Sequence, residues 1–116
     1  MSHHTAEHRS PQMNECISNC VSCHAICLET ITYCLEKGGK HASHEHIALL
    51  STCADICATS ADAMLRGTEV HRFTCAACAE ICRRCAEACE RMGDPEMARC
   101  VEACRRCADS CAAMAA

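Results

Sequence analysis

The stretch TCAACAEICRRCAEAC, from Thr74 to Cys89, decides how this chain folds. Its five cysteines stand alternately three and four residues apart, at Cys75, Cys78, Cys82, Cys85 and Cys89. Residues with this spacing lie on one face of an α-helix. A helix through the stretch therefore carries a thiol at each position of one face, where an ordinary bundle helix carries leucine or isoleucine.

The remaining cysteines repeat this spacing in three further segments. They are Cys16, Cys20, Cys23, Cys27 and Cys34 in the first segment, Cys53 and Cys57 in the second, and Cys100, Cys104, Cys107 and Cys111 in the last. Steps of three, four and seven residues form the seam along which helices of a bundle pack together. The pattern predicts four helices whose cysteine faces all point to one common axis.

Capping residues and glycines mark where these helices begin and end. Ser10 before a proline is typical of a helix start, and Gly38 of a helix end. Thr68 can cap the third helix, and Asp94 before a proline starts the last. We expect helices over residues 10–37, 43–65, 69–92 and 95–113. The short connections predict an all-α, antiparallel up-down-up-down four-helix bundle with a cysteine-lined core.

Composition agrees with a single domain whose core is made largely of sulfur. The chain has 116 residues, with sixteen Cys and six Met but only one Tyr and one Phe. Six Ile, five Leu and three Val supply all its branched aliphatic side chains. Because so few aliphatics usually indicate disorder, the cysteines must act as small buried hydrophobic residues. We expect one domain over residues 10–116, after a disordered, His-containing tail over residues 1–9.

Several classes of protein fit this sequence poorly. A net charge of −4 argues against nucleic acid as the main partner. No run of about eighteen apolar residues predicts a membrane span, and no apolar leader or twin arginine predicts export. No Ser/His/Asp set or phosphate loop indicates an enzyme, and a thiol oxidoreductase motif normally lies beside β-strands. We therefore expect a cytoplasmic, non-catalytic protein in a reducing compartment, where thiols stay free.

Thiols in such a number and arrangement favour a thiophilic metal over disulfides. Disulfide frameworks usually staple loop-rich chains, whereas these cysteines all lie within predicted helices. Thiolates select Cu(I), Zn(II) or iron–sulfur clusters, and the spacing matches neither cluster motif. Zn(II) held by four thiolates leaves two buried negative charges, but one Cu(I) per thiolate leaves none. The sequence thus favours about one Cu(I) per cysteine, with a zinc or cadmium buffer of the metallothionein type as the alternative.

Methionine and histidine occupy the seam positions that lie beyond the terminal cysteines of the four segments. Met13, Met64, His71 and Met114 gather at one end of the predicted bundle, and His46, Met92 and Met97 at the other. Thioether and imidazole are weaker Cu(I) ligands than thiolate, so they suit a mouth where ions arrive and move on. Methionine also fills bundle ends as a flexible core residue, which is the other interpretation. His3, His4 and His8 in the tail are further candidates for metal capture.

The segments CISNCVSCHAIC, CADIC, CAACAEICRRCAEAC and CVEACRRCADSC resemble the four-helix-bundle copper storage proteins, specifically the cytosolic branch. The resemblance covers about residues 13–114 and implies Cu(I) storage and detoxification by a homotetramer. It implies that all sixteen cysteines are ligands. It also implies that Met13 lies at the mouth, which makes Met13, Met64, His71 and Met114 the expected additional ligands. The chain departs from the family pattern in its second helix, which carries only two cysteines.

Overall fold

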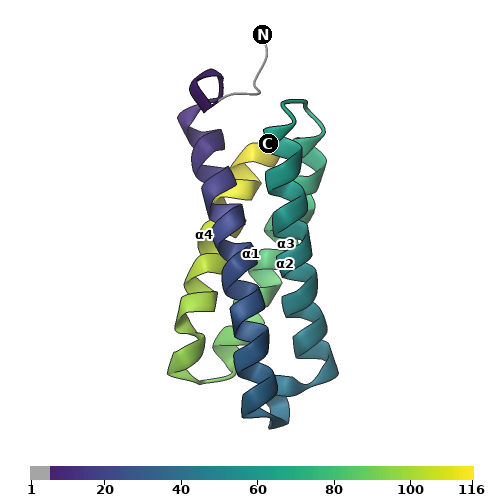
Figure 1. The fold of residues 1–116 in the computed structure, drawn as a ribbon, viewed down its shortest axis with the longest axis vertical. Helices are drawn as coiled ribbons and strands as arrows, with labels where there is room; N and C mark the ends of the chain where they lie inside the picture. The colour runs from purple at the N-terminus through teal and green to yellow at the C-terminus, as the bar shows by residue number, and fades with distance from the viewer. Residues whose placement is uncertain (1–5) are drawn as a thin grey trace.

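Four long helices make up almost the whole of a computed structural model that describes residues 6–116 (Figure 1). They are α1 (Pro11–Lys37), α2 (His44–Leu65), α3 (His71–Arg91) and α4 (Ala98–Ala115). Three short 3-10 helices, η1 (Ala6–His8), η2 (Gly39–Ala42) and η3 (Pro95–Met97), lie before α1, between α1 and α2, and before α4. The described residues contain no strand. The predicted all-α four-helix bundle is confirmed.

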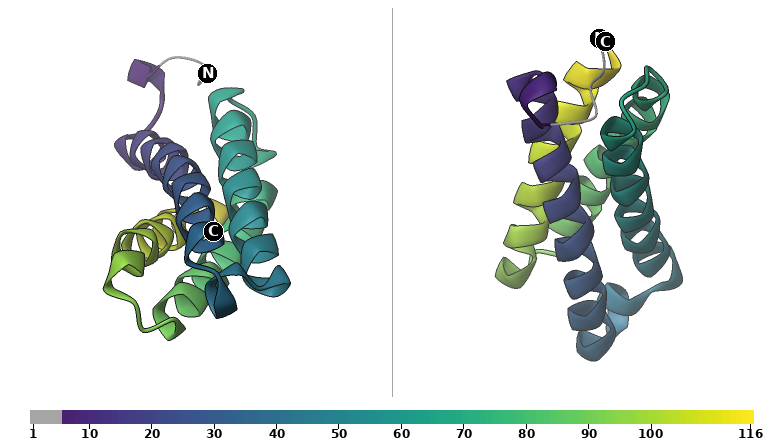
Figure 2. Two further views of the ribbon diagram at one scale, coloured as in Figure 1. Left: turned by 60° about the horizontal axis from the view of Figure 1, so that its bottom comes forward. Right: turned by 45° about the horizontal axis from the view of Figure 1, so that its top comes forward.

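The helices run alternately up and down and form a closed ring. Each packs against its two neighbours in the order α1, α2, α3, α4, and α4 returns to α1. The resulting rod measures 51 × 20 × 20 Å. Figure 2 shows that the α1–α2 and α3–α4 connections lie at the same end of it. We call this the lower end, as drawn in Figure 1; the α2–α3 connection and the C-terminus lie at the upper end.

Local chemistry explains most of the helix boundaries. The Ser10 hydroxyl accepts a hydrogen bond from the Met13 N–H at 3.1 Å, and Ser43 does the same for His46 at 3.2 Å. Gly38 ends α1 with a φ of 75°, in the left-handed region that side chains with a Cβ avoid, and its N–H donates to the Cys34 carbonyl.

Two predicted boundaries are wrong. Thr68 does not cap α3, which begins at His71 after a Val70 that already has helical φ and ψ. The last helix does not begin at Pro95 as an α-helix, because residues 95–97 form the tighter turn of η3. Asp94 still caps this turn, since its carboxylate accepts from the Glu96 N–H at 3.0 Å. Changes of helix type at a terminus are common because terminal hydrogen bonds rearrange easily.

The segment before α1 lies partly outside the described residues. Residues 1–5, with His3 and His4, are not described, so the expected disordered tail stays a prediction there. Ala6–His8 form η1, and the Asn14 side-chain amide of α1 donates to the Ala6 carbonyl at 2.9 Å. This described part of the tail is therefore held against the first turns of α1.

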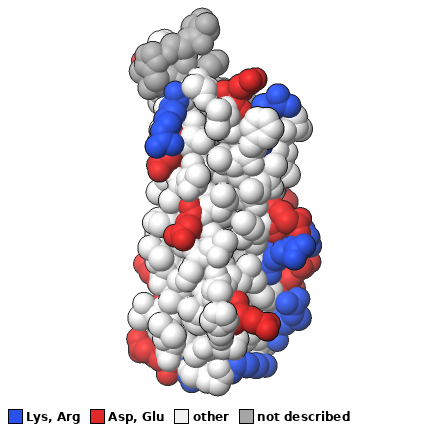
Figure 3. Space-filling view, turned by 90° about the vertical axis from the view of Figure 1, so that its right-hand side faces the viewer, with Lys and Arg blue, Asp and Glu red and all other residues white. Residues whose placement is uncertain are grey.

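The outer surface carries mixed charges in small groups, with wide uncharged areas between them in the view of Figure 3. Glu80 binds Arg84 at 2.6 Å, and Glu102 binds Arg106 at 2.5 Å, as the four-residue spacing predicts. Two ion pairs join helices: Arg105 with Glu90, and Arg99 with Glu29. Such exposed pairs contribute little to stability, so the bundle depends on its interior.

Helix α2 is long and apolar enough to cross a membrane by length and composition alone. In its most apolar window, 44% of the residues are buried inside the bundle. Its Cys53 and Cys57 side chains face the same core as those of the other helices. The buried apolar side chains account for this hydropathy, and we assign α2 to the bundle.

Candidate metal centre

Sulfur fills the axis of the bundle. All sixteen cysteines are free and buried, with at most 1% of any side chain exposed. Few other large side chains are completely enclosed with them, among them Leu50, Met64 and Met97. Two outcomes would have contradicted the sulfur-lined interior, namely disulfides and outward-facing thiols. Neither occurs at any of the sixteen positions.

The sulfur atoms form a continuous chain of contacts from the upper end to the lower end. Its steps join Sγ atoms of Cys16, Cys111, Cys20, Cys107, Cys57, Cys82, Cys53, Cys104, Cys100 and Cys89 in that order. Every step spans 3.5–4.0 Å. Side contacts add Cys23, Cys27 and Cys78 to it. An ion in this chain can change partners by small movements.

These separations suit metal–thiolate bonds. With metal–sulfur bonds of about 2.3 Å, two sulfurs on one ion lie about 3.8 Å apart in tetrahedral and about 4.0 Å apart in trigonal geometry. The thiols are therefore already spaced for three or four ligands per ion. Two thiolates in linear coordination require a sulfur–sulfur distance of about 4.6 Å, so the two thiols would have to move slightly apart.

Groups of four thiols overlap along the axis. In each group the four Sγ atoms all lie within 4.8 Å of one another. Three groups share no cysteine, namely Cys20–Cys78–Cys107–Cys111, Cys23–Cys53–Cys57–Cys82 and Cys27–Cys85–Cys100–Cys104. Others bridge them, because Cys23 and Cys53 also meet Cys27 and Cys104. The core therefore has no single centre but offers many overlapping sites.

The thiols hold their protons unequally. Burial raises the pKa of Cys34 to about 11, because a thiolate loses its water there. Deeper in the core, the contact between Cys100 and Cys104 lowers the pKa of Cys100 and raises the pKa of Cys104. In such a pair one thiol donates a hydrogen bond to the sulfur of the other. A monovalent metal ion that replaces one of these protons leaves the buried charge unchanged.

The four non-cysteine ligands expected at the upper end do not surround one opening. Met13 and His71 line the same cavity of about 210 Å³. Met114 lines a different one of about 320 Å³ beside α1, and Met64 is fully enclosed in the core. The Nδ1 atom of His71 lies 2.8 Å from the Thr68 carbonyl oxygen, which leaves Nε2 of the neutral ring unprotonated. The structure thus brings together two of the four residues at the surface.

The lower end holds two residues that the sequence-based set of ligands left out. Nε2 of His46 lies 3.6 Å from Sγ of Cys89, and Sδ of Met97 lies 3.8 Å from Sγ of Cys34. Both residues stand on the cysteine seams, so their spacing was the available signal. Of the other histidines, His24 joins α1 to α2 through the Ala54 carbonyl at 2.8 Å, away from the sulfur chain.

Comparison with known proteins identifies the group to which this sulfur-lined bundle belongs. The family model described as copper storage protein (Csp) matches residues 9–116. The chain belongs to the copper storage protein family. No curated protein matches it in sequence.

Solved structures that share the fold include the following two. The Nmul_A1745 protein from Nitrosospira multiformis is 42% identical, with a TM-score of 0.85 over 90% of this chain and 94% of that one. The Cu(I)-bound copper storage protein BsCsp3 is 35% identical, with a TM-score of 0.83 over 90% of this chain and 99% of that one. This chain thus has the bundle of a family member that has been seen with Cu(I).

Proposed function

We propose that this protein stores many Cu(I) ions in the cytoplasm, bound by its sixteen core thiolates, and so protects the cell from free copper. One observation carries the proposal: the buried sulfurs form a contact chain along the bundle axis. The Cu(I)-bound state of the relative BsCsp3 supports the choice of ion. Free thiols at all sixteen cysteines support a reducing compartment.

Charge favours Cu(I) over Zn(II) in this core. The three separate four-thiol groups could each hold a Zn(II), and every one would then carry two excess negative charges. No Lys or Arg is among the buried residues of the described chain to compensate those charges. Cu(I) replaces thiol protons one for one and keeps the interior neutral at any load.

Ligands at the upper end remain part of the proposal. We assign Met13, Met64, His71 and Met114 as weaker ligands where the sulfur chain approaches the surface. The cavity that Met13 shares with His71 supports this assignment. Neutral thioether and imidazole groups can hand an ion from solvent to the first thiolates without adding charge.

We also propose a homotetramer. Val21, Leu28 and Leu35 are 53%, 47% and 56% exposed and lie seven residues apart on one face of α1. This apolar stripe is suited to packing against a second copy of the chain. Light scattering should give a tetramer for the wild type and a smaller species for Leu28→Glu. A monomeric wild type at micromolar concentration would contradict the assembly.

An anaerobic titration tests the storage function. Reduced protein should take up about one Cu(I) per cysteine in competition with bicinchoninate. Saturation at one or two ions would defeat the proposal. To separate copper from zinc, the protein should be purified from cells grown with either metal, and its metal content measured. Copper in excess of zinc from both cultures supports storage of Cu(I), whereas zinc-filled protein from both supports the buffer.

A further inference from the structure

At the lower end of the bundle, the last cysteine of the sulfur chain contacts a histidine nitrogen. The His46 side chain is buried, with 4% of the residue exposed, and its Nε2 atom faces Cys89 at 3.6 Å. Cys89 in turn contacts Cys100 at 3.9 Å. Beside this set, Met97 and Cys34 pair through their sulfur atoms at 3.8 Å.

We propose that His46, Cys89 and Cys100 form a terminal Cu(I) site of three ligands, and that copper exchanges with external ligands through the adjacent groove between α3 and α4. The Cys34–Met97 pair is its neighbouring sulfur site. This inference rests on the proposed storage of Cu(I). It adds a mixed imidazole–thiolate site at the end opposite Met13.

The hydrogen bonds around His46 set its ring for this role. Its Nδ1 lies 2.8 Å from the His41 carbonyl oxygen, which can only accept, so in the neutral ring Nε2 keeps a lone pair directed at Cys89. The His41 ring is itself held by Asp94 at 3.0 Å, and Tyr33 donates to the same carboxylate at 2.5 Å. Metal-binding histidines are typically fixed in this way through their second nitrogen.

The Asp94 carboxylate is well placed to hold this arrangement. The hydrogen bond from Tyr33 lowers the pKa of Asp94 and raises the pKa of Tyr33 to about 12. Asp94 therefore stays ionised and Tyr33 stays a donor at neutral pH. Both connections of the lower end are tied together in this way, because Tyr33 belongs to α1, His41 to η2 and Asp94 to the turn before η3.

The distances fit three ligands rather than two. Bonds of about 2.0 Å to nitrogen and about 2.3 Å to sulfur place an ion between His46 and Cys89 at an angle of about 114°. That angle lies between the tetrahedral and trigonal values, far from the linear one, and leaves room for a third ligand. Cys100 supplies it, because its separation from Cys89 is close to the roughly 4.0 Å expected for two thiolates on one trigonal ion.

Charge explains why the end is capped by imidazole and thioether. An ion at the end of the sulfur chain has fewer thiols around it than one in the middle. A further thiolate would complete its coordination only by adding a buried negative charge, which is costly. His46 and Met97 are neutral donors, so they complete the terminal sites and preserve the balance of one thiolate per ion.

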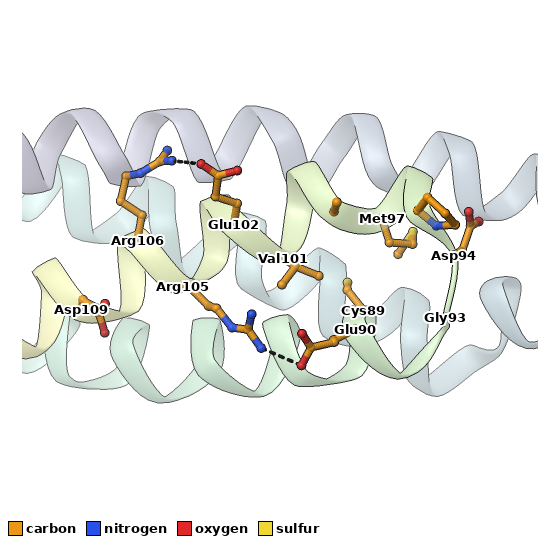
Figure 4. Close-up of a pocket in the computed structure, with 12 residues that line it drawn as sticks. Cys89, Glu90, Gly93, Asp94, Met97, Val101, Glu102, Arg105, Arg106 and Asp109 are labelled. Carbon is orange, nitrogen blue, oxygen red and sulfur yellow. Dashed lines mark hydrogen bonds and ion pairs between the residues drawn. The ribbon is translucent and has the colours of Figure 1, made fainter.

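A solvent-filled groove lies directly beside this end. The groove, of about 710 Å³, runs between α3 and α4, and Cys89 and Met97 are among the residues that line it (Figure 4). Ala98 and Val101 of α4 line its apolar part, and Arg105 and Glu90 bridge it farther along. Cys89 and Met97 form the buried floor of this groove, so a small side-chain movement there would bring a small thiol or chelator to the terminal site.

Nitrogen NMR tests the ligand assignment on the wild-type protein. Histidine labelled with ¹⁵N should show the Nε2 resonance of His46 move when Cu(I) fills the core, while that of exposed His44 stays in place. A His46 resonance that is unmoved in fully loaded protein would overturn the inference and leave storage intact. Failure to take up Cu(I) at all would overturn the proposed function as well.

Release kinetics test the exchange route. Loaded wild type and the control His44→Ala should show a fast phase of about one ion per chain on transfer to bathocuproine disulfonate, since imidazole binds Cu(I) less firmly than thiolate. His46→Leu should lose this phase. Ala98→Trp, which covers the groove from the exposed surface of α4, should slow it several-fold at unchanged capacity. If both His46→Leu and Ala98→Trp kept the fast phase unchanged, copper would not exchange through this groove.

Discussion

Helices α2 and α3 lie side by side and face the same core, yet α2 carries two cysteines and α3 carries five. Buried positions of α2 that continue its cysteine seam hold four other residue types, at His46, Leu50, Ser60 and Met64. They pack as completely as the thiols of α3, each with at most 4% exposure. Packing alone therefore does not require cysteine. The contrast fits the proposed storage role, in which α3 supplies five thiolate ligands and α2 supplies two at mid-height.

The largest effect on copper capacity is expected from removing cysteines of α3, which carries more cysteines than α2. Cys78 and Cys82 contact each other at 3.7 Å, and both also contact Cys57 of α2. Replacing both by serine keeps the side-chain size but removes two soft ligands. Capacity should fall by about two ions, one per lost thiolate, while the circular dichroism spectrum stays helical.

A matched control is available on the outer face of α3. Ala76 and Ala77 are exposed, so the double change of both to serine adds the same hydroxyls without touching the core. Its copper capacity should equal that of the wild type. Loss of helicity in the cysteine variant alone would instead show that Cys78 and Cys82 serve chiefly to pack the bundle.

A smaller effect of opposite sign, a gain in copper capacity, is expected from adding a cysteine to α2. Ser60 is fully buried, and its hydroxyl has no hydrogen-bond partner among residues 6–116. Ser60→Cys should add about one Cu(I), because the new sulfur continues the seam of Cys53 and Cys57. It should also raise the free energy of unfolding of the metal-free protein by about 1 kcal/mol, since a buried unpaired hydroxyl is removed.

Copper titration and urea unfolding measure the two parts of this prediction. Thr59→Cys is the control, because Thr59 is exposed and its thiol would face away from the core. Equal capacities for Ser60→Cys and the wild type would mean that seam position alone does not create a site.

The smallest effect concerns the outer face of α3. On α3, Glu80 binds Arg84 and Arg83, which lower the pKa of its carboxyl. Its stabilising effect is complete above the ordinary value of 4.5 and is lost as pH falls through the lower folded-state value. Glu80→Gln should therefore lower the melting temperature slightly at pH 7 and low salt, and not at all in high salt, where exposed pairs are screened. A salt-independent loss would point to a packing defect.

The sequence predicted the fold and the cysteine seams because both follow from local chemistry and helical spacing. The bounds of α1 came from Ser10, Pro11 and Gly38, and the inward face of each helix came from steps of three and four residues. The ends of the bundle could not be predicted in this way. His46 and His71 both stand one or two turns from a cysteine, but η2 folds over His46, whereas His71 lies partly exposed at the start of α3. Residue spacing identifies which face of a helix points to the core, but not which segment of the chain covers the end of that face.

The contacts at the lower end arise from tertiary structure. The resemblance to copper storage proteins implies a ligand at Met13 and so predicts additional ligands at the upper end. The contact of His46 with Cys89 depends on the His41 carbonyl and on Asp94, which lie five and forty-eight residues away along the chain. Only tertiary structure joins these groups.

Counting protons during copper binding tests the central claim most directly. If monovalent ions neutralise the buried thiols one for one, calorimetric titrations in buffers of different ionisation enthalpy should give one proton released per Cu(I) bound. That ratio should hold from the first ion to about the sixteenth. A ratio well away from one, or binding that stops after a few ions, would contradict a neutral, copper-filled core.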